Sequence, residues 1–74
     1  METEAYKKII SNLRTAIDES GYKQKVVAER AGMTPRQLND ILCFRKRLDA
    51  ADIPAFCIVL NISPAEVFEG AIAE

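Results

Sequence analysis

The segment TPRQLND at residues 34–40 carries hydroxyl, guanidinium, amide and carboxylate groups within about two helical turns. Thr34 can accept a backbone N–H as an N-cap, and Pro35 suits the first helical position because its missing N–H costs nothing there. Gln37, three residues after Thr34, can accept the Thr34 N–H and so complete a capping box. We therefore predict a helix that starts at Thr34 and presents hydrogen-bonding side chains.

Charge is distributed unevenly along the chain. The net charge is −1, but residues 23–47 sum to +5, whereas residues 48–74 contain no basic residue and sum to −5. A run of one sign is often only a solvated surface. Segregation on this scale instead favours a basic working surface formed by residues 23–47.

Catalysis and metal binding are not expected from this composition. The chain has no histidine, and its two cysteines do not form a C-x-x-C pair, whereas structural zinc needs about four ligands. It also has no nucleophile motif and no glycine-rich phosphate loop, so we expect no enzyme activity, no metal and no cofactor. Cys43 and Cys57 are expected to be buried free thiols in a reducing cytoplasm.

Length and hydropathy limit the class of protein further. The 74 residues are expected to form one domain, residues 1–74, with a small core. The N-terminal residues METEAYKK are polar, unlike a secretory leader, and no apolar run approaches the roughly 18 residues of a membrane span. We therefore expect a cytoplasmic protein without membrane contact.

Apolar residues recur at helical spacing and no convincing strand pattern is present, so the expected fold class is all-α. The predicted helices cover residues 4–20, 24–31, 35–44, 49–60 and 64–69. Ser63 and Glu66 repeat the capping-box spacing before the fifth helix, and Asp49 is expected to cap the fourth. The residues placed in the core are Leu38, Ile41, Phe56 and Phe68.

Residues 24–42, QKVVAERAGMTPRQLNDIL, combine two helical patterns with a glycine between them. Apolar residues fall at the fourth, eighth, tenth, fifteenth and eighteenth places, and the fifth place is the small Ala28. The ninth is Gly32, which can take the positive φ of a sharp turn. This arrangement is typical of the helix-turn-helix, whose second helix enters the DNA major groove. The stretch resembles the helix-turn-helix of the Cro/repressor family of phage and bacterial transcriptional regulators, and IPAFCIVLNISPAEVF resembles that family's fourth helix and the start of its fifth.

The resemblance implies a five-helix repressor-like domain whose helix-turn-helix is formed by helices two and three. It also implies sequence-specific binding of double-stranded DNA by a transcriptional regulator, which we expect to be a repressor in a bacterial cell or a phage-infected host. The residues expected to reach bases are Pro35, Arg36, Gln37, Asn39 and Asp40. Those expected at the phosphates are Lys23, Gln24, Thr34, Arg45, Lys46 and Arg47.

Arg36 is the strongest candidate base reader because Arg pairs bidentately with guanine O6 and N7. Asp40 either accepts from cytosine N4 or holds Arg36 as an i,i+4 partner, and we favour the second interpretation. Ile17 and Leu42 stand where family members often carry an ion pair between helix one and the end of helix three, so we expect an apolar contact there. Phe44 stands near the family's usual glycine after helix three, so this loop is expected to differ in shape.

The expected partner is a roughly palindromic DNA operator, bound by a homodimer that need not exist without DNA. The candidate dimer contacts are Val59, Ile62, Phe68 and Ile72. No small-molecule ligand is expected. The alternative function is a helix-turn-helix module that binds another regulator instead of DNA, as an antagonist or antitoxin. The acidic pI of about 5.4 and Asp40 on the recognition helix favour that alternative.

Overall fold

The computed structural model describes residues 3–71 and contains helices as its only regular secondary structure in that range. The five helices are α1 (Glu4–Ser20), α2 (Gln24–Arg30), α3 (Pro35–Leu42), α4 (Asp52–Leu60) and α5 (Pro64–Phe68). The predicted all-α class and the number of helices are therefore confirmed for this part of the chain. None of these helices is long and apolar enough to cross a membrane.

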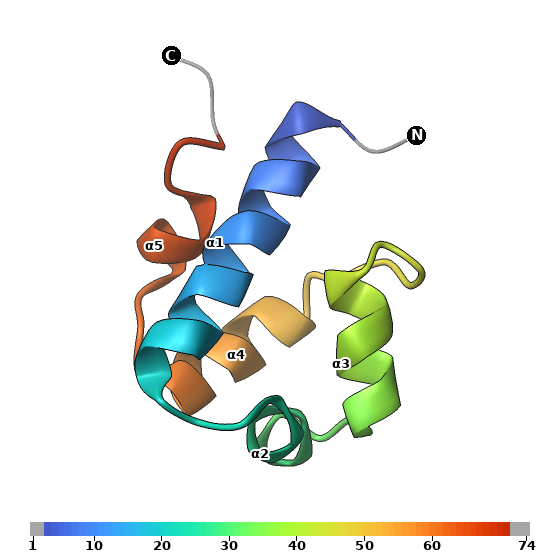
Figure 1. Cartoon of the computed structure of the whole chain (residues 1–74). Helices are drawn as coiled ribbons and strands as arrows, with labels where there is room; N and C mark the ends of the chain where they lie inside the picture. The colour runs from blue at the N-terminus through green and yellow to red at the C-terminus, as the bar shows by residue number, and fades with distance from the viewer. Residues whose placement is uncertain (1–2, 72–74) are drawn as a thin grey trace.

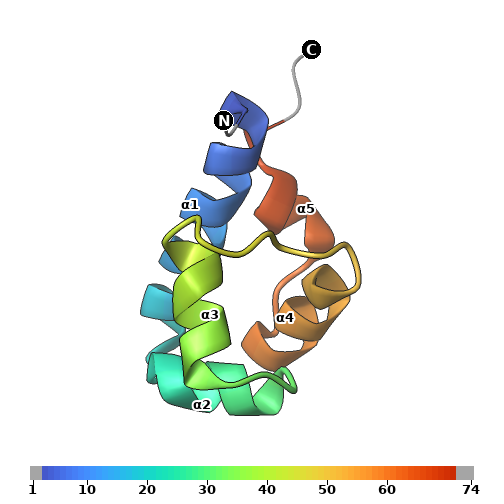
Figure 2. The same cartoon turned by 90° about the vertical axis from the view of Figure 1, so that its right-hand side faces the viewer.

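The helices surround α4, which packs against α1, α2 and α5 (Figure 1). α5 lies along α1, while α2 crosses the end of the molecule and leads directly into α3. The view at right angles shows α3 rising from α2 toward the loop that precedes α4 (Figure 2). The contact between α2 and α3 is the most extensive between any two helices.

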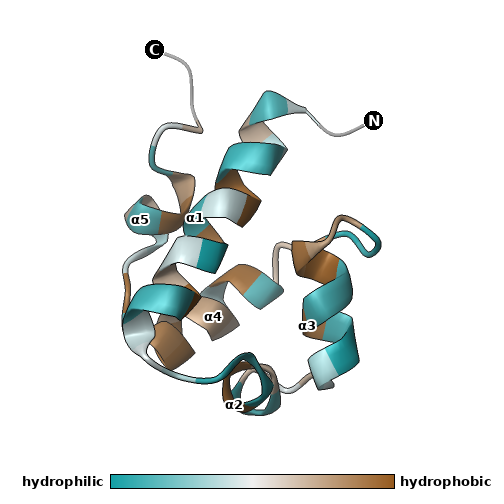
Figure 3. Cartoon of the chain, viewed as in Figure 1, coloured by the Kyte–Doolittle hydropathy of each residue, from teal (hydrophilic) through white to brown (hydrophobic). Residues whose placement is uncertain are grey.

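One cluster of buried side chains joins four of the five helices. Its members are Ile10, Leu13, Ile17, Val27, Ala28, Leu38, Ile41, Leu42, Phe56 and Leu60. α4 is hydrophobic over most of its length, in keeping with its central place (Figure 3). Burial of each large aliphatic side chain stabilises the fold by about 1.5–3 kcal/mol, so this cluster is what fixes the positions of the helices.

The core prediction is confirmed for Leu38, Ile41 and Phe56 but is wrong for Phe68. Val67 is the buried residue of α5, with 2 % of its surface exposed, and Phe68 is only half-buried. Neighbouring residues of a helix point about 100° apart, so this short helix can direct only one of the two toward α1.

The capping box predicted at the start of α3 is present. The Gln37 N–H donates to Thr34 Oγ1 at 3.1 Å, and the Thr34 N–H donates to Gln37 Oε1 at 2.9 Å. The second predicted box is wrong, because the Ser63 side chain makes no capping hydrogen bond at the start of α5. Instead the Glu66 N–H donates to the main-chain carbonyl of Ser63 at 3.0 Å.

The fourth helix begins later than predicted, and Asp49 does not cap it. α4 starts at Asp52, with Ala51 at the N-cap position. The Asp52 N–H donates to the Asp49 carbonyl at 2.9 Å, and the Asp49 N–H donates to Asp52 Oδ2 at 3.3 Å. These two bonds close a turn ahead of the helix, so the carboxylate that serves as acceptor here belongs to Asp52.

The Asn12 side chain of α1 forms hydrogen bonds with the end of α5. The Asn12 amide nitrogen donates to the main-chain carbonyls of Val67 and Glu69, each at 2.8 Å. Because α5 is only 5 residues long, its last carbonyls have few partners within the helix. Asn12 supplies those partners and holds the end of α5 along α1.

Candidate nucleic-acid interface

The turn between α2 and α3 requires a glycine for its backbone conformation. Gly32 has φ +82°, and a Cβ placed there would meet no atom within 4 Å. The Met33 N–H donates to the Ala28 carbonyl at 3.0 Å, which closes the turn. Ala28 is fully buried, so the two helices meet over a side chain small enough for close approach. Gly32 and Ala28 thus serve the purposes predicted for them.

α3 has one buried face and one exposed polar face. Leu38, Ile41 and Leu42 are in the core. The residues left exposed are Pro35, Arg36, Gln37 and Asn39, while Asp40 is half-buried. The capping box occupies the Gln37 Oε1 atom, so its amide nitrogen is the group left to donate outward. The helix therefore presents guanidinium and amide donors on a rigid support.

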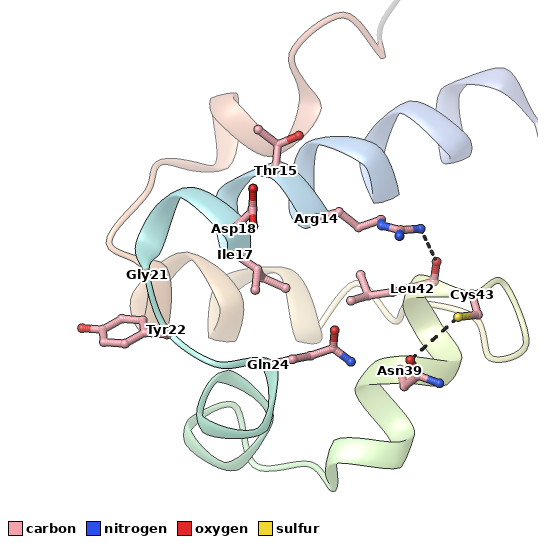
Figure 4. A pocket seen from close by; sticks show the side chains of 10 residues that line it. All are labelled: Arg14, Thr15, Ile17, Asp18, Gly21, Tyr22, Gln24, Asn39, Leu42 and Cys43. Atoms are coloured by element: carbon pink, nitrogen blue, oxygen red, sulfur yellow. Dashed lines mark hydrogen bonds between the residues drawn. The ribbon is translucent and has the colours of Figure 1, made fainter.

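A hollow of about 590 Å³ lies between α1, α2 and the end of α3. Gln24, the first residue of α2, lines this hollow and so lies near the end of α3. Asn39 also lines this hollow, and Asn39 Oδ1 accepts from Cys43 Sγ at 3.8 Å (Figure 4). Arg14, from α1, lines the same hollow and donates from Nη1 to the Leu42 carbonyl at 3.4 Å. Residues from three helices thus converge next to the exposed face of α3.

The two cysteines differ in exposure, which corrects the expectation that both thiols are buried. Both are free, but Cys43 is exposed and only Cys57 is buried. Cys43 follows the buried pair Ile41 and Leu42, and the next step of about 100° around the helix turns it outward. Burial raises the pKa of the Cys57 thiol, and the negative charge of Glu66 raises it further.

Asp40 pairs with Arg45 and not with Arg36, contrary to the favoured interpretation. Arg45 Nη1 lies 3.9 Å from Asp40 Oδ1, and the Arg45 side chain is 71 % exposed, so the ion pair itself contributes little stability. The hydrogen bonds of the Asp40 main chain hold the loop more firmly than this ion pair does. The Asp40 carbonyl accepts the N–H groups of Arg45 at 2.7 Å and Lys46 at 3.2 Å. Asp40 therefore fixes the chain that leaves α3.

At the start of the loop after α3, Phe44 adopts a backbone conformation that glycine would favour, while the expectation that this loop differs in shape from the family's stays a prediction. Phe44 has φ 65°. This left-handed conformation costs a residue with a Cβ about 1–2 kcal/mol. The Phe44 ring meets the ring of Tyr6 edge-on, with 6.1 Å between centroids. Contact between the rings offsets part of that cost.

Tyr6 was not predicted to take part in this region. Its hydroxyl accepts the Leu48 N–H at 2.9 Å, and the Arg47 guanidinium lies 4.8 Å above its ring. In the sequence Tyr6 is one member of an apolar helical stripe, and 42 residues separate it from Leu48. Local spacing carries no signal for such a contact.

The predicted base and phosphate residues all belong to α2, α3 and the segments that flank them. Lys23 is exposed at the N-cap position of α2, and Arg45, Lys46 and Arg47 are exposed after α3. Ile17 and Leu42 are both buried in the core, as expected for an apolar contact. The polar link between α1 and the end of α3 is the Arg14 hydrogen bond, which was not predicted.

No group of three or more His, Cys, Asp or Glu side chains within residues 3–71 is placed to hold a metal ion.

Comparison with protein families matches residues 12–70 to the Cro/C1-type HTH DNA-binding domain. Searches of curated proteins and of solved structures give no significant match. The matched residues include the second half of α1 and all of α2 to α5, with the turn at Gly32 and the polar face of α3. The chain therefore belongs to the Cro/C1-type helix-turn-helix DNA-binding domain family.

Proposed function

We propose that residues 1–74 form a single domain that binds double-stranded DNA in a sequence-specific manner and acts in the cytoplasm as a transcriptional repressor. The observation that carries this proposal is the state of α3. Its buried face is locked into the core and its N-terminus is held by the capping box. Its exposed face presents Arg36 and Asn39 on a helix that needs no ordering before it meets a groove.

Base reading is assigned first to Arg36. Arg pairs bidentately with guanine O6 and N7, and Arg36 is exposed in the first turn of α3, the end that faces base edges in this motif. Gln37 and Asn39 donate to bases or to neighbouring phosphates, and Pro35 contacts a thymine methyl group. Asp40 is the weakest of the predicted base readers, because Arg45 shares its carboxylate.

Phosphate contacts are assigned to groups on both sides of α3. Gln24 and Lys23 lie before it in the chain, and the exposed basic loop after it supplies Arg45, Lys46 and Arg47. The Thr34 oxygen accepts the Gln37 N–H, which leaves the hydroxyl proton to donate to a phosphate. Contacts of this kind position the protein, and they make its affinity dependent on salt.

We further propose that two copies bind a palindromic site, with their α3 helices about 34 Å apart. Ile58 supports this, since it is an apolar side chain on α4 with 81 % of its surface exposed. Val59 and Ile62 beside it are half-buried. Ile58 was not among the predicted dimer contacts. Of those, Phe68 is half-buried, and Ile72 lies outside the described residues.

The rival function, a module that binds another regulator, loses one of its two arguments. An acidic residue on the recognition helix would repel DNA, but the Asp40 carboxylate faces the Arg45 guanidinium. The remaining argument is the acidic pI, and that acidity comes largely from residues 48–74. The charge of the segment that contains α2 and α3 is opposite in sign.

Selection of duplexes from a random library, followed by sequencing, tests the proposal. We expect enrichment of one site with twofold symmetry and half-sites one helical turn apart. The variant Arg36→Ala serves as a matched control and should lose enrichment at one base pair of each half-site. Recovery of random sequence with the wild-type chain would contradict sequence-specific binding.

A further inference from the structure

We propose that Tyr6, in the first turns of α1, is a positioning residue that holds residues 44–48 in the conformation that meets DNA phosphates. This inference rests on the proposed function, because it concerns how the basic loop does its work. Tyr6 itself contacts the loop and not the nucleic acid. The loop contains the three consecutive basic residues Arg45, Lys46 and Arg47.

Tyr6 contacts the first residue and the last two residues of this segment. At the start, the Phe44 ring packs edge-on against the Tyr6 ring, with centroids 6.1 Å apart and an interplanar angle of 62°. At the end, the Tyr6 hydroxyl accepts the Leu48 N–H at 2.9 Å. Between them, the Arg47 guanidinium lies 4.8 Å above the ring. One side chain therefore spans the loop.

The body of Tyr6 is itself fixed. It is half-buried and packs against the hydrophobic core. The first turn of α1 is also capped, since the Tyr6 N–H donates to Thr3 Oγ1 at 3.1 Å. The support for the loop thus comes from the main body of the fold and not from another mobile surface group.

The opposite side of the loop is fixed by α3. The Asp40 carbonyl accepts the Arg45 and Lys46 N–H groups, and the Phe44 N–H donates to the Ile41 carbonyl at 3.2 Å. Together with the Leu48 N–H, these hydrogen bonds hold the backbone at both ends of residues 44–48. The basic side chains remain exposed on this ordered backbone.

An ordered loop binds phosphates more tightly than a disordered one because the entropy of ordering is lost during folding and not during binding. Removal of the Tyr6 contacts should therefore weaken DNA binding through the loop. The same change should leave the contacts of α3 with base edges intact. Weaker phosphate binding with unchanged base preference therefore distinguishes a positioning role of Tyr6 from a general loss of stability.

Two substitutions of Tyr6 test its hydroxyl contact and its ring contacts separately. Tyr6→Phe removes only the hydroxyl that accepts the Leu48 N–H, and Tyr6→Leu also removes the two ring contacts. We expect affinity for the selected site to fall about fivefold for Tyr6→Phe, as for loss of one net hydrogen bond. We expect a fall of about twentyfold for Tyr6→Leu, with a salt slope shallower by about one to two units.

Tyr22→Leu is the matched control. Tyr22 also carries an arginine over its ring, with Arg30 4.8 Å from the centroid, but it lies outside the loop and its contacts. Its loss tests whether removal of any exposed tyrosine with a stacked arginine has the same effect. We expect the salt slope of this control to equal that of the wild type.

A second comparison repeats Tyr6→Phe in a chain whose loop carries Arg45→Gln, Lys46→Gln and Arg47→Gln. If Tyr6 acts by positioning these charges, its substitution should no longer change DNA affinity in that background. An unchanged fivefold loss there would show that Tyr6 acts elsewhere and would overturn the inference.

Amide hydrogen exchange of Leu48 gives a readout that needs no DNA. We expect exchange of the Leu48 amide to be about fivefold faster in Tyr6→Phe, because the hydrogen bond that protects it is lost. The midpoint of thermal unfolding should fall by about 4–8 °C, as expected for one net hydrogen bond in a domain of this size. Equal exchange in both chains would overturn the anchoring role. Faster exchange with unchanged DNA affinity would overturn the positioning role. Failure of the wild type to bind any duplex would instead overturn the proposed function, while the exchange data would still decide whether Tyr6 anchors the loop.

Discussion

The guanidinium of Arg14 donates a hydrogen bond to the main-chain carbonyl of Leu42 over 3.4 Å, which links α1 to the last residue of α3. The final carbonyls of a helix lack partners within it, and a positive charge near them is favourable. α3 is therefore held at both ends, by the Thr34 capping box at its start and by Arg14 at its finish.

Replacement of Arg14 by Met should lower the free energy of unfolding by about 1 kcal/mol, because a charged donor to the end of α3 is lost. Urea denaturation followed by circular dichroism measures this change. Lys7→Met is the matched control. Lys7 forms an exposed ion pair with Glu4 at 3.7 Å, and its loss should cost about 0–0.5 kcal/mol. Equal costs for the two variants would contradict a specific role for Arg14.

Thr34→Ala should destabilise the fold by about 0.5–2 kcal/mol, whereas Ser63→Ala should have little effect. The Thr34 hydroxyl oxygen accepts a capping hydrogen bond, but the Ser63 side chain makes none. The same denaturation experiment compares the pair. A larger loss for Ser63→Ala would show that the start of α5, and not that of α3, depends on its cap.

Arg36→Ala should weaken binding to the selected site by about 1–3 kcal/mol and relax preference at one base pair of each half-site. Fluorescence anisotropy on the selected duplex and on single-base variants measures both effects. Lys25→Ala removes the same charge from the exposed surface of α2 and should lower the affinity for all duplexes by the same factor. If Arg36→Ala also lowers the affinity for all duplexes by the same factor, Arg36 contacts a phosphate and not a base.

Ile58→Lys should prevent two copies from binding side by side, with little change in monomer stability because 81 % of the Ile58 side chain is already exposed. Sedimentation with a duplex that carries the intact palindrome measures the stoichiometry. Ile58→Leu keeps the apolar surface and should still give two chains per duplex. A one-to-one complex of the wild type on that duplex would rule out the dimer.

The thiol of Cys43 should react with a disulfide reagent in the folded protein, while Cys57 should react only on unfolding. The thiolate is the reactive form, and burial both raises the pKa of Cys57 and blocks access to it. A colour assay at neutral pH, with Cys43→Ser and Cys57→Ser to assign each phase, measures the two rates. Rapid labelling of Cys57 in the native state would contradict its burial.

The helices and the helix-turn-helix could be predicted because they depend on local spacing. The apolar period of residues 24–42, the small Ala28 and Gly32 all act within a few residues of one another. The cap at Thr34 is equally local. The same capping-box pattern gave a wrong prediction at Ser63, where the main-chain carbonyl of Ser63, and not its side chain, accepts the hydrogen bond.

The parts that could not be predicted depend on contacts between distant segments. Tyr6 is indistinguishable from its apolar neighbours in the pattern of α1 until the loop 44–48 is placed against it. Arg45 competes with Arg36 for Asp40 only because Phe44 turns the chain back with a positive φ. The predicted roles of Arg36, Gln24 and the basic loop in DNA binding stay predictions until the experiments above are done.

The two hydrogen bonds from Asn12 have a practical consequence for surface-based assays. They direct the end of α5 along α1, on the side of α1 away from α3 (Figure 1). The first turns of α1, in contrast, hold the basic loop through Tyr6. A biotin or fluorophore attached after α5 should therefore leave the loop and α3 accessible on a sensor chip, whereas a bulky group attached before α1 would crowd the loop.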